Sequence, residues 1–291
     1  MPSMTADAGF VSVIISFLNA ERFLEEAIAS VRSQEYPHWE LLLVDDGSTD
    51  RSSEIARAWA QSEPHRVRYF QHPSHANLGL SASRNLGLRA ACGEYVAFLD
   101  ADDVWLPQRL RRGVAILRAN PGIAMVYGRT LYWHSWDEDA TRRDRVQPHW
   151  FSAGSTVEAP ELLIRYLEYR AALPPPTSLL VRRAACRNVG GFDESFRLMH
   201  EDQVFLAKIC LGCAVYVSNE CWDKYRQHRD SACARAECAD QTAEAERRYI
   251  DWLRCYLQQH GHARGRVWDA LQRRATRRPS ALRRLRMLWP A

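Results

Sequence analysis

Long apolar runs are absent from this sequence. No stretch reaches the roughly 18 consecutive apolar residues that a membrane-spanning helix needs. The first residues, MPSMTADAG, also lack the basic and apolar regions of a secretory signal peptide. We therefore expect a cytoplasmic protein. Its 291 residues, of which 46% are apolar and 25% charged, suffice for one large domain or two smaller ones with a real core.

Closely spaced cysteines are also rare. Among the eight cysteines only Cys210 and Cys213, in CLGC, lie close together, and Cys221 follows without a second CxxC motif. In a reducing compartment this pattern favours buried thiols over a zinc site.

Acidic residues are scarce at the C-terminal end. From Arg264 onward the chain has nine arginines and one acid, Asp269. The excess of positive over negative side chains that gives the net charge of +4 therefore lies there. Residues 279–291 predict either an interfacial helix for an anionic inner-membrane surface or a solvated helix packed on the domain. Such arginines also suit nucleic-acid phosphates. No aromatic platform or groove-reading motif accompanies them, so we expect no nucleic-acid partner.

Strand-like and helix-like segments alternate through the first half of the chain. The expected strands are VSVIISF (11–17), ELLLVDD (40–46), VRYF (67–70) and EYVAFLD (94–100); the expected helices follow a cap at Asn19, run through 52–60 and run through 80–91. This alternation predicts a parallel sheet with crossover helices. Ligands of such sheets bind beyond the carboxyl ends of the strands.

The second half of the chain is less regular. We expect Pro107 to open a helix, MVYG and TLYWHSW to form strands, and residues 137–147 to form an exposed loop. The stretch PPPTSLLVRRAACRNVGGFDE (174–194) predicts a strand, a helix and a Gly-Gly turn. After Arg229 the composition becomes helical and rich in arginine.

Three aspartates follow the apolar segment VAFL. Asp100, Asp102 and Asp103 crowd one strand end in VAFLDADDVW (96–105), where like charges repel unless a cation is bound. Carboxylate oxygens suit Mg²⁺ or Mn²⁺, which would keep open positions for a diphosphate. The alternative is an acidic surface turn, which the buried strand before it makes less attractive.

Two further charged side chains should face the same crevice. Arg84, in SASRNLG, is placed to reach a phosphate or a base, and its alternative is a solvated helix arginine. Asp46 follows the second strand and could accept a hydrogen bond from the imide N–H of a uracil-like base, or simply cap a helix.

A second acidic pair precedes an apolar helix face. Glu201 and Asp202, in LMHEDQVFLAKI, suit a helix N-terminus, where acids are stabilised. A carboxylate beside a metal–diphosphate site is also what deprotonates an attacking hydroxyl.

Together these motifs resemble a known family. VSVIISFLNAERFLEEAIASVRSQEYPHWELLLVDDGSTD, LSASRNLGL, GEYVAFLDADDVWLPQRL, SLLVRRAACRNVGGFDESF, HEDQVFLAKI and YRQHRDS resemble the successive motifs of family 2 inverting glycosyltransferases over about residues 11–230. The resemblance implies an α/β fold of the GT-A type. Residues 9–230 would form the catalytic domain, with a nucleotide-sugar half (9–103) and an acceptor half (104–230), and residues 231–291 a helical arginine-rich extension.

The resemblance also implies roles for particular residues. By position, the nucleotide-sugar contacts are Ser16, Asp45, Asp46, Arg84 and Asp100; the metal ligands are Asp100, Asp102 and His228; the base is Asp202; and the acceptor side has Gly190, Gly191 and Glu201. Asp103 would brace the acidic turn. Leu18 stands where many relatives carry a tyrosine, so stacking on the base is not expected from that position.

The activity implied is a metal-dependent, inverting sugar transfer. The donor would be a nucleotide diphosphate sugar, with UDP as the expected nucleotide, and the acceptor a hydroxyl of a glycan or lipid-linked molecule in cell-surface polysaccharide synthesis. Mn²⁺ or Mg²⁺ is the expected cofactor.

Two alternatives remain open from the sequence. LDADDV also fits the nucleophile motif of haloacid-dehalogenase-like phosphatases, in which Asp100 would be phosphorylated. Such an enzyme needs a lysine at the phosphate, and only Lys208 and Lys224 exist. The other alternative is a binding protein of the same fold that lacks catalysis.

Overall fold

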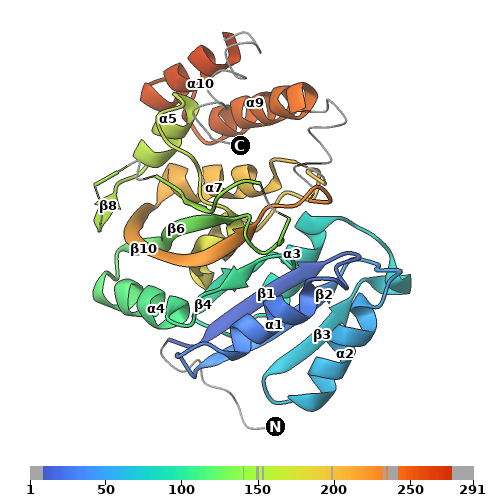
Figure 1. Cartoon of the computed structure of the whole chain (residues 1–291). Helices are drawn as coiled ribbons and strands as arrows, with labels where there is room; N and C mark the ends of the chain where they lie inside the picture. Colours follow the sequence, from blue (N-terminus) through green and yellow to red (C-terminus); the bar gives the residue numbers. More distant parts are fainter. Residues whose placement is uncertain are drawn as a thin grey trace.

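One mixed sheet with helices on both faces organises the chain (Figure 1). The computed structural model describes residues 9–139, 141–148, 151–152, 154–197, 199–231, 234 and 242–276. Residues 279–291, for which the sequence predicts either an interfacial or a solvated helix, lie outside the described residues. No helix in the described ranges has both the length and the apolar composition to cross a membrane.

The first half forms the predicted parallel sheet. Its strands are β1 (Val11–Phe17), β2 (Trp39–Asp45), β3 (Val67–Gln71) and β4 (Tyr95–Phe98), in the order β3-β2-β1-β4. The connecting helices are α1 (Leu24–Arg32), α2 (Ser52–Ser62) and α3 (Leu80–Ala90). β1 and β2 are buried along their whole length, which explains why they read as continuous apolar runs.

The predicted helix cap at Asn19 is wrong. α1 begins at Leu24, and its N-cap residue, Phe23, makes no side-chain capping hydrogen bond. Asn19 has a φ of 51°, and its Oδ1 accepts a 2.8 Å hydrogen bond from the backbone N–H of Thr49. Asn19 therefore ties the loop after β1 to the loop after β2, which keeps these two strand ends together.

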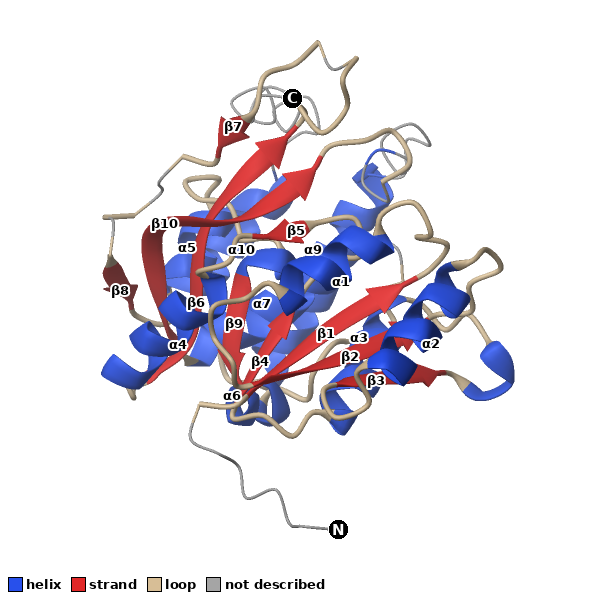
Figure 2. Cartoon of the chain, turned by 60° about the horizontal axis from the view of Figure 1, so that its bottom comes forward, coloured by secondary structure: helices blue, strands red, loops and turns tan. Residues whose placement is uncertain are grey.

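The second half extends the same sheet with mostly antiparallel strands (Figure 2). β4 pairs with β9 (Leu179–Arg182), and the order continues through β6 (Ile123–Trp133), β10 (Ala214–Arg226) and β5 (Val104–Trp105). Two short strands complete it, β7 (Arg145–Val146) on β6 and β8 (Ser155–Val157) on β10.

Several expectations for this half need correction. MVYG and the TLYW of TLYWHSW belong to one strand, β6, which ends at Trp133. β6 continues through Gly128, where a Cβ would lie 2.7 Å from the carbonyl oxygen of Glu220. The loop predicted at 137–147 includes β7 at its C-terminal end. β10, a 13-residue strand, was not predicted at all.

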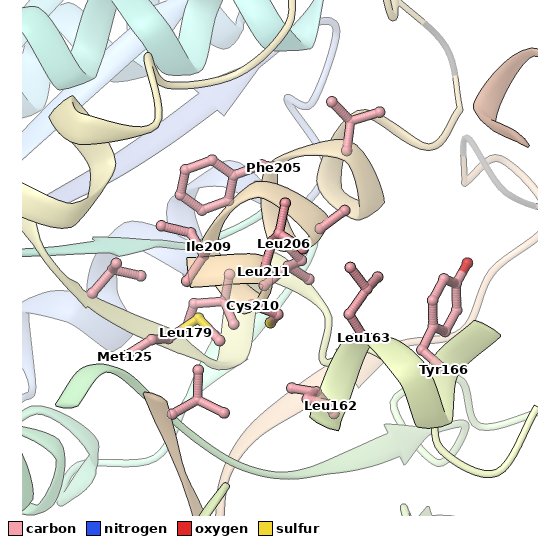
Figure 3. Packing of buried hydrophobic residues seen from close by; sticks show 14 of the residues in the cluster. Met125, Leu162, Leu163, Tyr166, Leu179, Phe205, Leu206, Ile209, Cys210 and Leu211 are labelled. Carbon is pink, nitrogen blue, oxygen red and sulfur yellow. The ribbon is translucent and has the colours of Figure 1, made fainter. Parts of the chain in front are cut away.

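The helices cover both faces of the sheet. α1, α2 and α4 (Arg109–Ala119) lie on one face. The other face carries α3 with α5 (Glu161–Leu167), α6 (Arg183–Asn188), α7 (Glu201–Gly212), α9 (Thr242–Gln259) and α10 (Arg266–Thr276). In Figure 3, Phe205 and Ile209 of α7 pack over Met125 and Leu179 of the sheet.

The C-terminal helices share this core. Tyr249 and Leu253 of α9 and Leu271 of α10 are fully buried in the same cluster as α5 and α7. The prediction of buried thiols holds for Cys186 and Cys210 only: among the other described cysteines, Cys213 and Cys221 are half-buried and Cys92 and Cys255 are exposed. α9 thus packs on α7, and α10 packs on α5 and α9, so these two helices cover the helices that lie on the sheet.

The loop between α6 and α7 is fastened to α3. Asn85 donates from Nδ2 to the carbonyl oxygen of Phe192 at 2.9 Å and accepts the N–H of Phe192 at 2.8 Å. Gly191, just before it, has a φ of 66°, and a Cβ there would lie 2.5 Å from Oδ1 of Asn85. Gly190 has a φ of 71° but faces open space.

These two glycines allow a paired test of the fastening. Gly190→Ala pays only the left-handed backbone penalty, about 1 kcal/mol of unfolding free energy. Gly191→Ala adds the clash with Asn85, for a total of about 2–4 kcal/mol. Urea unfolding of both variants measures the difference; equal losses would contradict the close contact with Asn85.

Candidate active site

The acidic turn after β4 is built into the sheet. Asp103 is fully buried, and its carboxylate accepts hydrogen bonds from Oγ1 of Thr177 at 2.6 Å and from the N–H of Arg226 at 3.0 Å. Burial, and next the charges of Asp102 and Asp100, raise the pKa of Asp103 well above its usual range. Asp103 therefore has the geometry of the bracing residue that the sequence predicted.

Asp100 and Asp102 remain partly open. Their side chains are 28% and 26% exposed, in contrast to the buried Asp103. Burial, opposed by Arg84 and reinforced by Asp102, raises the pKa of Asp100. The turn thus presents two carboxylates from a rigid support, which is unlike a free acidic surface turn.

Arg84 joins the two acidic pairs. This side chain is 3% exposed, and its Nη2 lies 2.7 Å from Oδ1 of Asp100 while its Nη1 lies 3.5 Å from Oε1 of Glu201. Its guanidinium also lies over the ring of Phe192. Burial alone would lower the pKa of Arg84, but Asp100 and Glu201 outweigh it and raise the pKa. A solvated helix arginine is therefore excluded.

Glu201 and Asp202 form the first turn of α7. Burial, and next the charge of Asp202, raise the pKa of Glu201 to about 7. Burial also raises the pKa of Asp202, against the opposing charge of Arg84 and with a smaller contribution from Asp100. Oδ1 of Asp202 accepts the N–H of Gln203 at 2.7 Å. Carboxyl groups poised in this way can exchange protons near neutral pH.

His228 follows the end of β10 and contacts the acidic turn. Its Nε2 lies 2.9 Å from Oδ2 of Asp102, and its ring packs between Phe23 and Trp136. The sequence alone would place a lone histidine on the surface, yet this side chain is 8% exposed. The family resemblance therefore located a contact that the local pattern does not reveal.

Asp102 and His228 fit a divalent cation. In an octahedral site with bonds of about 2.0–2.1 Å, adjacent ligand atoms are roughly 2.9 Å apart. The two side-chain atoms are 2.9 Å apart. The described residues contain no cluster of three or more His, Cys, Asp or Glu side chains suited to a metal. A cation held by these two residues would complete its shell with substrate oxygens and water.

Asp46 holds the start of α3, and Asp45 holds the loop between β2 and α2. Asp46 accepts the N–H groups of Leu78 and Gly79 at 2.9 and 3.0 Å and the Ser83 hydroxyl at 3.1 Å, so it caps α3. Asp45 is fully buried and accepts hydrogen bonds from Ser48 and Tyr69, among others. Burial raises the pKa of Asp45, but the hydrogen bonds, led by those from Ser53 and Ser48, outweigh it and lower the pKa. We therefore expect Asp45 to position the loop between β2 and α2 rather than to contact a ligand.

Ser16 lies at the carboxyl end of β1. Its hydroxyl is buried and has no hydrogen-bond partner among the described residues. Leu18 and Leu78, two exposed large apolar side chains, flank Asp46: the N–H of Asp46 bonds the carbonyl of Phe17, and its carboxylate bonds the N–H of Leu78. These strand ends and the loops beside them therefore contain one buried unpartnered hydroxyl and two exposed apolar side chains.

The remaining predicted residues lie as follows. Gly191 packs on Asn85, next to Arg84 on α3, and Gly190 is exposed. The two lysines are engaged elsewhere: Lys208 donates to the carbonyl of Gly191, and Lys224 lies over the ring of Trp133. Arg84, rather than a lysine, is the cation paired with Asp100.

Two residues that shape the site were missed. Thr177 accepts the N–H of Asp100 at 3.2 Å and donates to Asp103. Arg226 donates from Nε to the carbonyl of Asp102 at 2.7 Å. In the sequence, the three prolines before Thr177 could have indicated a rigid backbone at that residue. Arg226 could have been found because it lies within the motif YRQHRDS.

The chain is similar in sequence and in fold to known glycosyltransferases. The family model described as glycosyl transferase family 2 matches residues 12–189. TuaG of Bacillus subtilis (strain 168), provisionally named as a teichuronic acid biosynthesis glycosyltransferase, is 28% identical over 224 residues, which are 77% of this chain and 81% of TuaG. Against two other relatives, matched over shorter stretches, the chain spans only 35% and 48% of their length.

Solved structures share the fold. Residues 1–349 of Staphylococcus aureus TarS, in complex with UDP-GlcNAc, are similar with a TM-score of 0.62 and 23% identity, over 77% of this chain and 60% of TarS. The mannosyltransferase PcManGT from Pyrobaculum calidifontis, in complex with GDP-Man and Mn²⁺, is similar with a TM-score of 0.56 and 22% identity, over 77% and 59% of the two chains.

The family model covers more than half of the chain and includes the strand ends and α3 that carry the acidic turn and Arg84. The chain has the mixed sheet of the GT-A fold and belongs to glycosyltransferase family 2.

Proposed function

We propose that this protein transfers a sugar from a nucleotide diphosphate donor, with UDP as the nucleotide, to a hydroxyl of a glycan or lipid-linked acceptor. The anomeric configuration would invert, and the product would enter a cell-surface polysaccharide. The observation that carries this proposal is Arg84, whose guanidinium reaches both Asp100 of the metal-binding turn and Glu201 beside the base. Donor activation and acceptor deprotonation would thus occur at one place.

The donor nucleoside fits the ends of β1 and β2. The unpartnered hydroxyl of Ser16, the capping carboxylate of Asp46 and the exposed side chains of Leu18 and Leu78 offer polar and apolar contacts for a base. TarS, a structural neighbour, binds UDP-GlcNAc, which supports a UDP-sugar here by analogy. The teichuronic acid assignment of TuaG supports a polysaccharide product.

Asp102 and His228 would hold the divalent cation. When bound, Mn²⁺ or Mg²⁺ would neutralise the charge that develops on the departing diphosphate. Asp100, in the same turn, is paired with Arg84. This pairing would orient Asp100 toward the donor and neutralise its charge.

Asp202 would act as the general base. Oδ1 is engaged by the N–H of Gln203, so we assign the proton transfer to Oδ2. The acceptor oxygen forms a bond to the anomeric carbon as the bond from that carbon to the diphosphate oxygen breaks, and the acceptor proton passes to Asp202. Attack from the face opposite the diphosphate inverts the configuration. Gly190, Gly191 and Glu201 would border the acceptor.

The phosphatase alternative lacks its lysine. Lys208 donates to Gly191 and Lys224 lies over Trp133, while Asp100 is held by Arg84. The cytoplasmic, membrane-peripheral location expected from the sequence stays a prediction.

Replacement of the base tests the assignment directly. Asp202→Asn should lower transfer by about 10²–10⁴-fold, because proton transfer to a positioned carboxylate contributes that much. Binding of UDP with Mn²⁺, measured by calorimetry, should stay within about twofold of the parental value because the donor contacts remain. Transfer at the parental rate would show that another group takes the proton.

The pH profile tests which of the two carboxyl groups takes the proton. A base with a raised pKa loses activity as the pH falls through that pKa, so the parental enzyme should lose transfer at a higher pH than an ordinary aspartate would give. If Asp202 is the base, Glu201→Gln should keep this acid limb, because burial and the charge of Asp100 raise the pKa of Asp202. Loss of the acid limb in Glu201→Gln would assign the proton transfer to Glu201.

Metal dependence has its own variant. Asp102→Asn should reduce the Mn²⁺-dependent part of the thermal shift given by UDP, because one of two protein ligands loses its charge. The shift given by UDP in EDTA should not change, since the nucleoside contacts lie on β1 and β2. An undiminished Mn²⁺ effect in this variant would remove Asp102 from the metal site.

A further inference from the structure

A buried polar cluster lies where α7 meets the C-terminal helices. We define the helix-start cluster as His200, Gln203, Tyr166, Glu246 and Arg274. They come from α5 (Tyr166), the start of α7 (His200 and Gln203), α9 (Glu246) and α10 (Arg274). In Figure 1 these four helices lie together in the upper part of the molecule. The family model ends at residue 189, before most of this cluster.

Arg274 is the centre of the cluster. It is 6% exposed, and its Nε lies 2.6 Å from Oε1 of Glu246. Nη1 and Nη2 donate to the carbonyl and the hydroxyl of Tyr166, at 3.3 and 3.2 Å. The guanidinium also lies over the rings of Tyr166 and Tyr169. Opposite charge and aromatic faces together compensate for the burial of this cation.

The cluster continues into the start of α7. Tyr166 donates from its hydroxyl to Oε1 of Gln203, and Nδ1 of His200 lies 2.6 Å from the same oxygen. Nε2 of His200 lies 3.7 Å from Oε2 of Glu246, and its ring stacks on Tyr249. The side chains of His200 and Gln203 are therefore contacted directly from α5 and α9, and Arg274 of α10 holds the two contacting residues, Tyr166 and Glu246.

His200 needs this support because its backbone is left-handed. Its φ is 64° at the N-cap position, a conformation that a residue with a Cβ rarely adopts. Its carbonyl accepts the first helical hydrogen bond, from the N–H of Val204 at 2.8 Å. The direction in which α7 starts, and so the orientation of Glu201 and Asp202, depends on this one residue.

We propose that Arg274 and Glu246 are positioning residues, which act through His200 and Gln203 to fix the carboxylate of Asp202 against the acceptor. This role rests on the proposed function of Asp202 as the base. It makes the C-terminal helices α9 and α10 part of the transfer machinery, in addition to their share of the core.

The test uses a variant that removes both buried charges, so that neither remains unpaired. Arg274→Met with Glu246→Gln replaces the ion pair by neutral side chains of similar size, which proteins tolerate in their interior. The matched control is Arg273→Met. Arg273 also comes from α10 and pairs with Glu168 beyond the end of α5 at 2.7 Å, but this pair is more exposed and does not include α7.

Two readouts separate positioning from general stability. In the double variant, amide hydrogen exchange at Gln203 and Val204 should become at least about tenfold faster, and kcat should fall by about 10–100-fold because a small misplacement of the base is costly. UDP binding should stay within about twofold. In an Asp202→Asn background the same two substitutions should lower the residual transfer no further. Arg273→Met should change none of these quantities.

Several results would overturn the proposal. Unchanged exchange at Gln203 and Val204, an equal effect of Arg273→Met, or the same fold-loss with and without Asp202 would each show that the cluster only stabilises the fold. If the parental protein binds UDP but transfers no sugar from any donor, the proposed function fails and the positioning role fails with it. If the parental protein transfers sugar and only the exchange is unchanged, the positioning role alone is lost.

Discussion

The buried guanidinium of Arg84 is the interaction on which the site depends. A charge removed from water must find opposite charge nearby, and Arg84 finds it in Asp100 on one side and Glu201 on the other. Because Arg84 lies on α3, whose start is capped by Asp46, the same helix connects the end of β2 with the acidic turn. One helix therefore connects the end of β2, the acidic turn and the start of α7.

The charges of this region do not balance without a ligand. Asp100, Asp102, Glu201 and Asp202 outnumber Arg84. Burial is the main cause of the raised pKa values of Asp100, Glu201 and Asp202, and the neighbouring carboxylates add to it. A divalent cation would relieve it, and a diphosphate would then bind to the cation. Such a site would give Asp100 and Asp102 a reason to follow an apolar strand, while Asp103 braces the turn through Thr177 and Arg226.

Local patterns were enough for the first half of the fold and for part of the site. Buried strands such as Val11–Phe17 and the spacing of apolar residues on α1 can be read from neighbouring letters. The 13-residue β10 could not, because its length is set by pairing with β6 and β8 from distant parts of the chain. For the same reason the local pattern predicts a helix cap at Asn19, whereas the hydrogen-bond partner of Asn19, Thr49, lies on another loop.

The candidate site residues also differ in whether the sequence alone reveals them. Asp100, Asp102, Glu201 and Asp202 stand in contiguous motifs, so the sequence could name them. The hydrogen-bond donors to the Asp46 carboxylate lie more than 30 residues away, and the contact of His228 with Asp102 spans 126 positions. Such contacts depend on tertiary packing, which single-sequence patterns do not encode.

Arg274 illustrates the limit most clearly, since it is one of nine similar arginines near the C-terminus. Apolar packing would hold α10 against α5 and α7 but would not fix the rotation of α7, because apolar contacts are non-directional. The hydrogen bonds that run from Arg274 through Tyr166 to Gln203 are directional, and they end next to Asp202. A charged side chain in this place therefore has a geometric reason to be buried, one that core packing alone does not supply.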